Sequence, residues 1–174
     1  MKDLRLVEPS EEYKAEYLNM IQEWEKTGER MVPFTLRYDC SDFTLFLQEM
    51  NHLKVGENVN ERTGNSSTFW LVHSNKKVVG AVNIRHKLND SLREIGGHIG
   101  YGIRPSERNK GFATLQLALA LIKAREMGLD RVLVTCDKEN IASAKTIVNN
   151  GGRLDSEGLV DGMLIQRYWI EMKE

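Results

Sequence analysis

The sequence predicts a mixed α/β fold in which a single sheet of about seven strands carries about four helices on its faces. Two kinds of pattern lead to this prediction. Short runs with apolar side chains at alternate positions, typical of strands, are interspersed with longer runs in which apolar side chains recur at helical spacing. The 174 residues suffice to bury a substantial core, so we expect one domain over residues 1–174.

The N-terminal part is expected to form one strand followed by two helices. Alternation over 4–6 indicates a strand that Pro9 ends, and Ser10 is the expected N-cap of a helix with apolar spacing over 13–24. Ser41 is the expected cap of a second helix. One face of that helix is apolar, through Phe43, Phe46, Leu47 and Met50.

The rest of the chain predicts six strands and two helices. A loop over 58–67 leads into a hairpin rich in β-branched residues, and Asp161-Gly162 signals another hairpin near the C-terminus. Asn140 is a favourable N-cap for the last helix. The expected strands are 68–72, 77–85, 94–104, 131–137, 153–159 and 163–172, and the expected helices are 111–127 and 141–150.

Composition excludes several classes of protein. The 24 Lys and Arg residues nearly balance the 25 Asp and Glu residues, so we expect neither nucleic acid nor an anionic membrane as a partner. No apolar run is long enough to span a bilayer, and the N-terminus lacks the apolar core of a signal peptide. Cys40 and Cys136 are far apart, which favours free thiols and a cytoplasmic location. No histidine pair has metal-ligand spacing, so we expect no metal.

Residues 98–114 carry the strongest functional signal. Apolar side chains alternate up to Pro105, which ends the strand, and a helix then begins near Gly111. The free backbone N–H groups of the first helical turn favour an anion, and a glycine there lets the backbone approach a phosphate closely. Arg108 and Lys110 add positive charge beside this turn.

The signature Arg108-x-x-Gly111-x-Ala113 at a strand-to-helix turn, in this order of elements, resembles the GNAT superfamily of N-acetyltransferases. Strands 99–103 and 130–135 are similar to the fourth and fifth strands of that family. Asn140-x-x-Ser143, followed by glycines at 151 and 152, resembles the subgroup that includes ribosomal-protein N-acetyltransferases. The resemblance covers about residues 68–155 and implies a mostly antiparallel sheet that splays between its fourth and fifth strands.

The resemblance also implies acetyl-CoA as the cofactor. Ile103 would present main-chain groups to the pantetheine arm and the thioester, Asn140 would contact that arm, and Ser143 would lie near the sulfur. The pyrophosphate would be bound by backbone N–H groups of Arg108, Asn109, Lys110, Gly111, Phe112, Ala113 and Thr114.

The implied reaction is transfer of an acetyl group to a primary amine of a small molecule, a peptide or a protein. His98 is the leading candidate for the general base, because histidine titrates near neutral pH, although it could instead pack against His86. Glu94 is the reserve base, and its alternative role is that of a solvated surface charge. The state of assembly is expected to be a monomer or a homodimer.

One position departs from the family pattern. Many members place a tyrosine in the last helix as the general acid, but Ile147 stands there in this chain. Ser143 or water could then protonate the thiolate, or the thiolate could leave unprotonated because it is only modestly basic. Tyr101 is a nearby alternative that is more typical of a core residue. The departure keeps open a different class of function, a non-catalytic acyl-CoA-binding or sensing module. Residues 33–39 correspond in position to the family's variable acceptor loop.

Overall fold

The computed structural model describes residues 3–57 and 59–172. Its seven strands form two antiparallel sheets, with strand orders β1-β2-β3-β4 and β5-β7-β6. The first sheet comprises β1 (Leu4–Val7), β2 (Ser66–His73), β3 (Val78–Arg85) and β4 (Ile99–Ile103); the second comprises β5 (Arg131–Asp137), β6 (Arg153–Val160) and β7 (Met163–Glu171). The α-helices are α1 (Lys14–Glu25), α2 (Phe43–Val55), α3 (Asp90–Glu94), α4 (Phe112–Glu126) and α5 (Ile141–Asn149).

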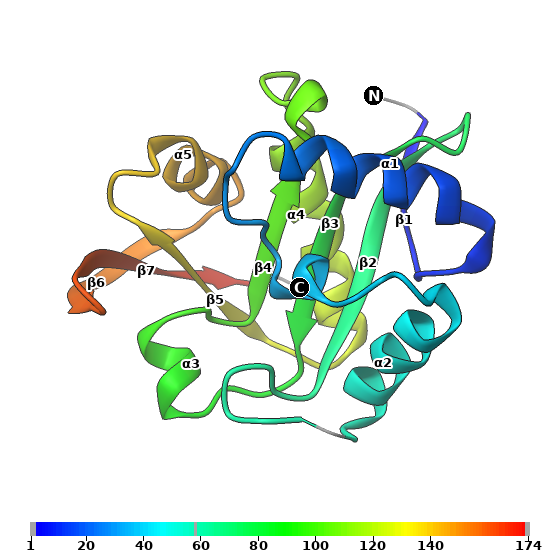
Figure 1. Cartoon of the computed structure of the whole chain (residues 1–174). Coiled ribbons are helices and arrows are strands. Elements are labelled where there is room, and N and C mark those ends of the chain that lie inside the picture. Colours follow the sequence, from blue (N-terminus) through cyan, green and yellow to red (C-terminus); the bar gives the residue numbers. More distant parts are fainter. Residues whose placement is uncertain (1–2, 58, 173–174) are drawn as a thin grey trace.

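The predicted fold class is confirmed, and the splay between the fourth and fifth strands separates the sheet into two hydrogen-bonded parts. The two sheets meet at one end of β4, where the His98 N–H donates to the Leu133 carbonyl at 2.7 Å. The Gly96 N–H donates to Thr135 Oγ1 at 2.9 Å beside that contact. From this junction β4 and β5 diverge, and the space between their diverging backbones is called the opening (Figure 1).

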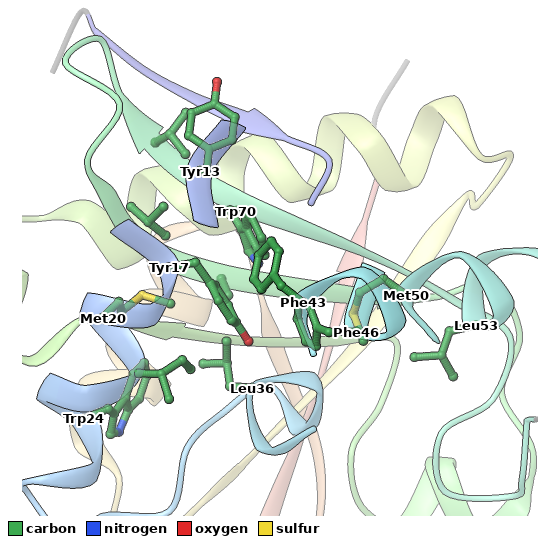
Figure 2. Close-up of a cluster of buried hydrophobic side chains, with 14 residues drawn as sticks. Tyr13, Tyr17, Met20, Trp24, Leu36, Phe43, Phe46, Met50, Leu53 and Trp70 are labelled. Carbon is green, nitrogen blue, oxygen red and sulfur yellow. The ribbon is translucent and has the colours of Figure 1, made fainter. Parts of the chain in front are cut away.

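The helices cover the sheets on both faces. Helices α1 and α2 lie on one face of the first sheet, and α4 lies on the other face and also contacts α5 (Figure 1). Aromatic side chains from α1, α2 and β2 form the core under the first two helices (Figure 2). This aromatic cluster consists of Tyr13, Tyr17, Trp24, Phe43, Phe46 and Trp70.

The prediction of a strand over 94–104 was wrong at its beginning. Residues 90–94 form the short helix α3, because the Asn89 side chain caps it by accepting a hydrogen bond from Leu92 N at 2.8 Å. Gly96 and Gly97 then adopt φ angles of 106° and 59°, so the chain cannot extend before His98. A Cβ on Gly97 would overlap the Leu133 carbonyl, so glycine also permits the close contact with β5.

Two predicted caps also differ from the structure. Asp42, not Ser41, caps α2, because its Oδ1 accepts hydrogen bonds from Thr44 N and Leu45 N. The side chain of Ser10 forms no capping hydrogen bond; that residue precedes a 3-10 turn, after which α1 begins at Lys14.

Other local predictions are confirmed. Asn140 caps α5 by accepting a hydrogen bond from Ser143 N at 3.0 Å. The last hairpin turns at Asp161 and Gly162, which both have positive φ angles. Asn58, at the start of the predicted loop, lies outside the described residues, as do the two residues at each end of the predicted domain. Over the described ranges, no helix combines the length and apolarity needed to cross a membrane.

Candidate active site

The N-terminus of α4 forms an uncapped cradle at the wide end of the opening. Gly111 precedes the helix with a φ angle of 78°, and no side chain caps the first turn. A Cβ placed on Gly111 would meet no atom within 4 Å, so the space in front of the turn is free. The N–H groups at the start of α4 are therefore available to an anionic group, with the positive end of the helix dipole behind them.

The two cations beside this cradle are already paired with carboxylates. Arg108 bonds Glu29 across 2.7 Å and also donates through Nε to the Ile103 carbonyl at 3.2 Å. The hydrogen bond from Arg108 lowers the pKa of the Glu29 carboxyl. Lys110 Nζ lies 2.9 Å from an oxygen of Glu107. An anionic ligand would therefore be bound chiefly by backbone N–H groups, because the two neighbouring cations are already neutralised by carboxylates.

Helix α1 holds the turn between β4 and α4 in place. Arg104, which directly follows β4, is 6% exposed and donates through Nε to Glu23 at 2.6 Å. The other oxygen of Glu23 accepts a hydrogen bond from Ser106 N at 2.7 Å. Glu16 adds a second ion pair to the same guanidinium at 3.3 Å. These bonds fix the backbone that leads into the cradle.

The register of β4 exposes part of its main chain to the opening. Arg85 N donates to the His98 carbonyl and Arg104 N donates to the Val79 carbonyl, so these residues form hydrogen-bonded pairs with β3. Hydrogen-bonded and non-bonded pairs alternate in an antiparallel ladder. The main-chain N–H and C=O groups of Tyr101 and Ile103 therefore face away from β3, toward β5.

Helix α5 supplies the opposite wall of the opening. The Asn140 cap orients the first turn, which carries Ser143. Ser143 Oγ lies 3.0 Å from the Tyr101 hydroxyl, which also donates to the Ser143 carbonyl at 3.4 Å. Cys136, near the end of β5, is buried, and the Ser143 side chain influences the pKa of its thiol. A phenol from β4 and a hydroxyl from α5 thus meet across the opening, and a thiol from β5 lies beside them.

Burial raises the pKa values of two of these groups. The pKa of Tyr101 is raised to about 12 by its removal from water, against a smaller opposite effect of the Ser143 hydrogen bond. The pKa of the Cys136 thiol is raised to about 11 for the same reason. Both groups are therefore protonated at neutral pH and act as hydrogen-bond donors.

His98 lies at the narrow end of the opening, where the sheets join. Its Nδ1 accepts a hydrogen bond from Leu133 N at 2.9 Å, so in the neutral ring the proton is on Nε2. Burial, together with Arg93, Arg85 and Arg131, lowers the pKa of His98 to about 4. The ring therefore offers a donor and no free lone pair, which weighs against a role as general base.

Glu94 lies at the end of α3 and contacts β7. Its Oε2 accepts a hydrogen bond from Arg167 at 2.7 Å, and its carbonyl oxygen accepts another from Arg167 Nε at 2.9 Å. The Glu94 side chain remains 67% exposed. It is thus held near the junction of the sheets by an arginine.

The segment after α1 packs on the same face of β4 as α1 does. A Cβ on Gly102 would overlap the Val32 carbonyl, and one on Gly100 would lie 3.6 Å from Pro33. The ring of Phe34 lies under the guanidinium of Arg85, at 5.1 Å. Burial lowers the pKa of Arg85 to about 10. The start of the predicted acceptor segment, residues 33–39, therefore packs directly on the strand that borders the opening.

Most of the predicted coenzyme residues surround one opening. The turn over 108–114, Ile103, Asn140 and Ser143 lie along it, whereas His98 and Glu94 lie at its closed end. Tyr101 was interpreted from the sequence chiefly as a core residue. Its partner is 42 residues away, so only its unusual place between two glycines of a strand hinted at another role.

Comparison with known proteins identifies the family of the chain. The family model described as an acetyltransferase (GNAT) domain matches residues 3–153. Curated protein sequences yield no match. The chain is similar in structure to the microcin C7 self-immunity acetyltransferase MccE in complex with acetyl-CoA and AMP, with 18% identity and a TM-score of 0.68. That alignment covers 99% of this chain and 94% of the other.

Two further solved structures share the fold. RimL, a ribosomal L7/L12 alpha-N-protein acetyltransferase in complex with coenzyme A, is 13% identical with a TM-score of 0.72, over 99% of this chain and 96% of that one. A dodecameric spermidine N-acetyltransferase from Vibrio cholerae is 15% identical with a TM-score of 0.66, over 98% and 95%. Because the family model spans most of its length and these structures share its fold, this chain belongs to the GNAT family of acetyltransferases.

Proposed function

We propose that this protein transfers an acetyl group from acetyl-CoA to a primary amine, which attacks the thioester directly. The observation that carries the proposal is the uncapped N-terminus of α4, which lies beside outward-facing main-chain groups of β4 and beside Ser143. An anion-binding helix N-terminus next to such main-chain groups suits a pyrophosphate with a long neutral arm.

The residues along the opening fit the coenzyme. The space in front of Gly111 accommodates a pyrophosphate bound to the N–H groups of residues 108–114. The pantetheine arm is bound by the outward main-chain groups of Ile103 and by Asn140 Nδ2, since the Oδ1 atom of Asn140 is used by the helix cap. When bound, the coenzyme supplies an activated acetyl thioester.

The chain's own groups act on charge and position. The Ile103 N–H faces the opening and donates to the negative charge that develops on the carbonyl oxygen. Ser143 lies on the opposite wall and donates toward the sulfur. Holding the amine and the thioester in contact contributes several kcal/mol, on the order of 5, to lowering the barrier.

The proton on the attacking nitrogen needs a separate acceptor. His98 and Glu94 remain the two residues to test, and the bond from Leu133 N to His98 Nδ1 makes Glu94 the better candidate. Glu94→Gln keeps an acceptor for Arg167 but removes the carboxylate, and we expect it to lower turnover. Turnover equal to wild type would leave water as the acceptor of this proton.

The segment 33–39 is proposed to select the acceptor, because its first residues pack over β4 beside the opening. The similar structures include enzymes for microcin C7 self-immunity, for a ribosomal protein and for spermidine, so their acceptors differ widely in size. We propose an amine acceptor, a cytoplasmic location and action as one domain, in a monomer or a homodimer.

The proposal is tested by measuring thiol release. Purified protein is mixed with acetyl-CoA and with a panel of amines: spermidine, a peptide with a free N-terminal serine, and an AMP derivative that carries a primary amine. We expect one class to release coenzyme A well above the rate without amine. Binding of acetyl-CoA without release from any amine would favour a non-catalytic acyl-CoA-binding module, and no binding at millimolar ligand would overturn the proposal.

A further inference from the structure

We propose that Tyr101 of β4 is the catalytic residue that protonates the leaving thiolate, together with Ser143. This inference rests on the proposed function, since it assigns a residue to that reaction. It replaces the tyrosine that the family pattern expects on α5 with one that reaches the same opening from the opposite wall.

The position on α5 cannot supply a proton. Ile147 stands there, is fully buried, and packs against Gly152, where a Cβ would overlap its side chain. Ile147 belongs to the apolar core between α4, α5 and the sheets. A tyrosine acid must therefore come from another element.

The Tyr101 side chain points toward α5, and its hydroxyl contacts Ser143, as the role of an acid requires. Its main-chain groups face the opening, and its hydroxyl reaches across to Ser143 Oγ at 3.0 Å. The same hydroxyl donates to the Ser143 carbonyl at 3.4 Å. The phenol thus ends on the wall where the predicted sulfur neighbour lies.

Other buried tyrosines lack this arrangement. The Tyr17 hydroxyl is buried in the aromatic cluster without a hydrogen-bond partner. Tyr168 donates to Gln166, which lies two residues away on the same strand. Tyr101 is distinct from both because its partner belongs to the opposite wall of the opening.

The proton balance is simple. As the amine nitrogen bonds the carbonyl carbon, the carbon–sulfur bond breaks and its electron pair remains on sulfur. Tyr101 gives its phenolic proton to that sulfur, directly or through the Ser143 hydroxyl. The nitrogen loses one proton to the separate acceptor proposed above as it becomes an amide, and the phenolate regains a proton from water. Coenzyme A and the acetylated amine leave, and the protein returns to its starting state.

The acidity of neighbouring groups suits such a transfer. Burial raises the pKa of Tyr101 to about 12 and that of the nearby Cys136 thiol to about 11. Tyr101 therefore holds its proton at neutral pH and has it to donate when the thiolate leaves.

The test compares Tyr101→Phe with Tyr168→Phe, a matched control that removes a buried tyrosine hydroxyl elsewhere. The first readout is an ultraviolet titration of the thiol of bound coenzyme A, which needs no acceptor. We expect Tyr101→Phe to raise the pKa of that thiol, because a donor to the thiolate is lost. We expect the control to titrate like wild type.

The second readout is turnover with the amine found in the panel. Tyr101→Phe should lower kcat by about 100-fold with little change in the KM for acetyl-CoA, which is the range of general acid catalysis. If the two hydroxyls share one path, adding Ser143→Ala should cause no further loss. Fully additive losses would overturn their joint action.

An unchanged thiol pKa and wild-type turnover in Tyr101→Phe would overturn this inference alone. Failure of the wild-type protein to bind coenzyme A would instead overturn the proposed function. The two failures are therefore distinguishable.

Discussion

The aromatic cluster under α1 and α2 and the opening between the sheets each contain a buried tyrosine, but the two hydroxyls are treated differently. Tyr17 stacks on Trp70 with ring centroids 4.5 Å apart, and its hydroxyl has no partner (Figure 2). Tyr101 places its hydroxyl 3.0 Å from Ser143. Burial raises the pKa of both phenols.

The two tyrosines therefore have different roles: Tyr17 stabilises the fold, whereas Tyr101 is placed to take part in the reaction. In the aromatic cluster the phenol contributes a ring to packing, and its oxygen is incidental. In the opening, the strand, the cap of α5 and the divergence of β4 from β5 together orient a donor. We therefore expect substitutions in the cluster to change stability and substitutions at the opening to change turnover.

The largest expected effect is on stability, from Trp70→Ala in the aromatic cluster. The indole is fully buried, so its removal leaves a large cavity that should cost about 3–5 kcal/mol in the free energy of unfolding. Chemical denaturation measures this loss. At low temperature, where the variant is folded, its affinity for coenzyme A should remain near that of wild type. A large loss of affinity would mean that the cluster also shapes the opening.

A smaller effect is expected from His98, at the closed end of the opening. Its folded pKa of about 4 lies below the usual histidine value of 6.5, so the unfolded chain binds more protons between these pH values. Stability should therefore be present above pH 6.5 and fall as the pH drops toward 4, by ~2 kcal/mol. Denaturation across this range should show a weaker pH dependence in His98→Gln, and an identical dependence would contradict this account of the ring.

The two side-chain helix caps provide a matched pair. Asn140→Ala and Asp42→Ala each remove the cap of one helix and should each cost about 1 kcal/mol of unfolding free energy. Only the cap of α5 orients Ser143, so turnover should fall in Asn140→Ala and stay near wild type in Asp42→Ala. Thiol release measures turnover, and thermal unfolding measures stability. Equal turnover in the two variants would contradict the claim that the cap of α5 positions Ser143 for the reaction.

The smallest effect is expected for Tyr17→Phe. Removing a buried hydroxyl without a partner should leave stability unchanged or raise it by less than about 1 kcal/mol. Denaturation together with thiol release should show no loss of either quantity. A marked loss of turnover would show that the aromatic cluster takes part in the chemistry.

The sequence predicted the features that local patterns determine. The N-cap Asn140, the turn at Asp161-Gly162 and the strand-to-helix turn before Gly111 each depend on a few neighbouring residues, and the structure has all three. The aromatic face of α2 was equally clear from its helical spacing.

What the sequence could not predict depends on contacts between distant segments. Helix α3 was missed because its five residues are too few for a periodic pattern and because Asn89 was not taken as a cap. The state of His98 depends on Leu133, and the role of Tyr101 depends on Ser143, both far away in the chain. Neither contact leaves a mark in local spacing.

The most direct test of the central claim is a calorimetric titration of acetyl-CoA into wild type, Gly111→Val and Gly128→Val. Both glycines have positive φ angles, of 78° and 83°, and both have open space at the Cβ position, so the backbone strain is matched. Only Gly111 lies at the cradle; Gly128 follows the other end of α4. The account predicts that Gly111→Val weakens binding at least tenfold while Gly128→Val binds like wild type, and equal affinities in the two variants would contradict it.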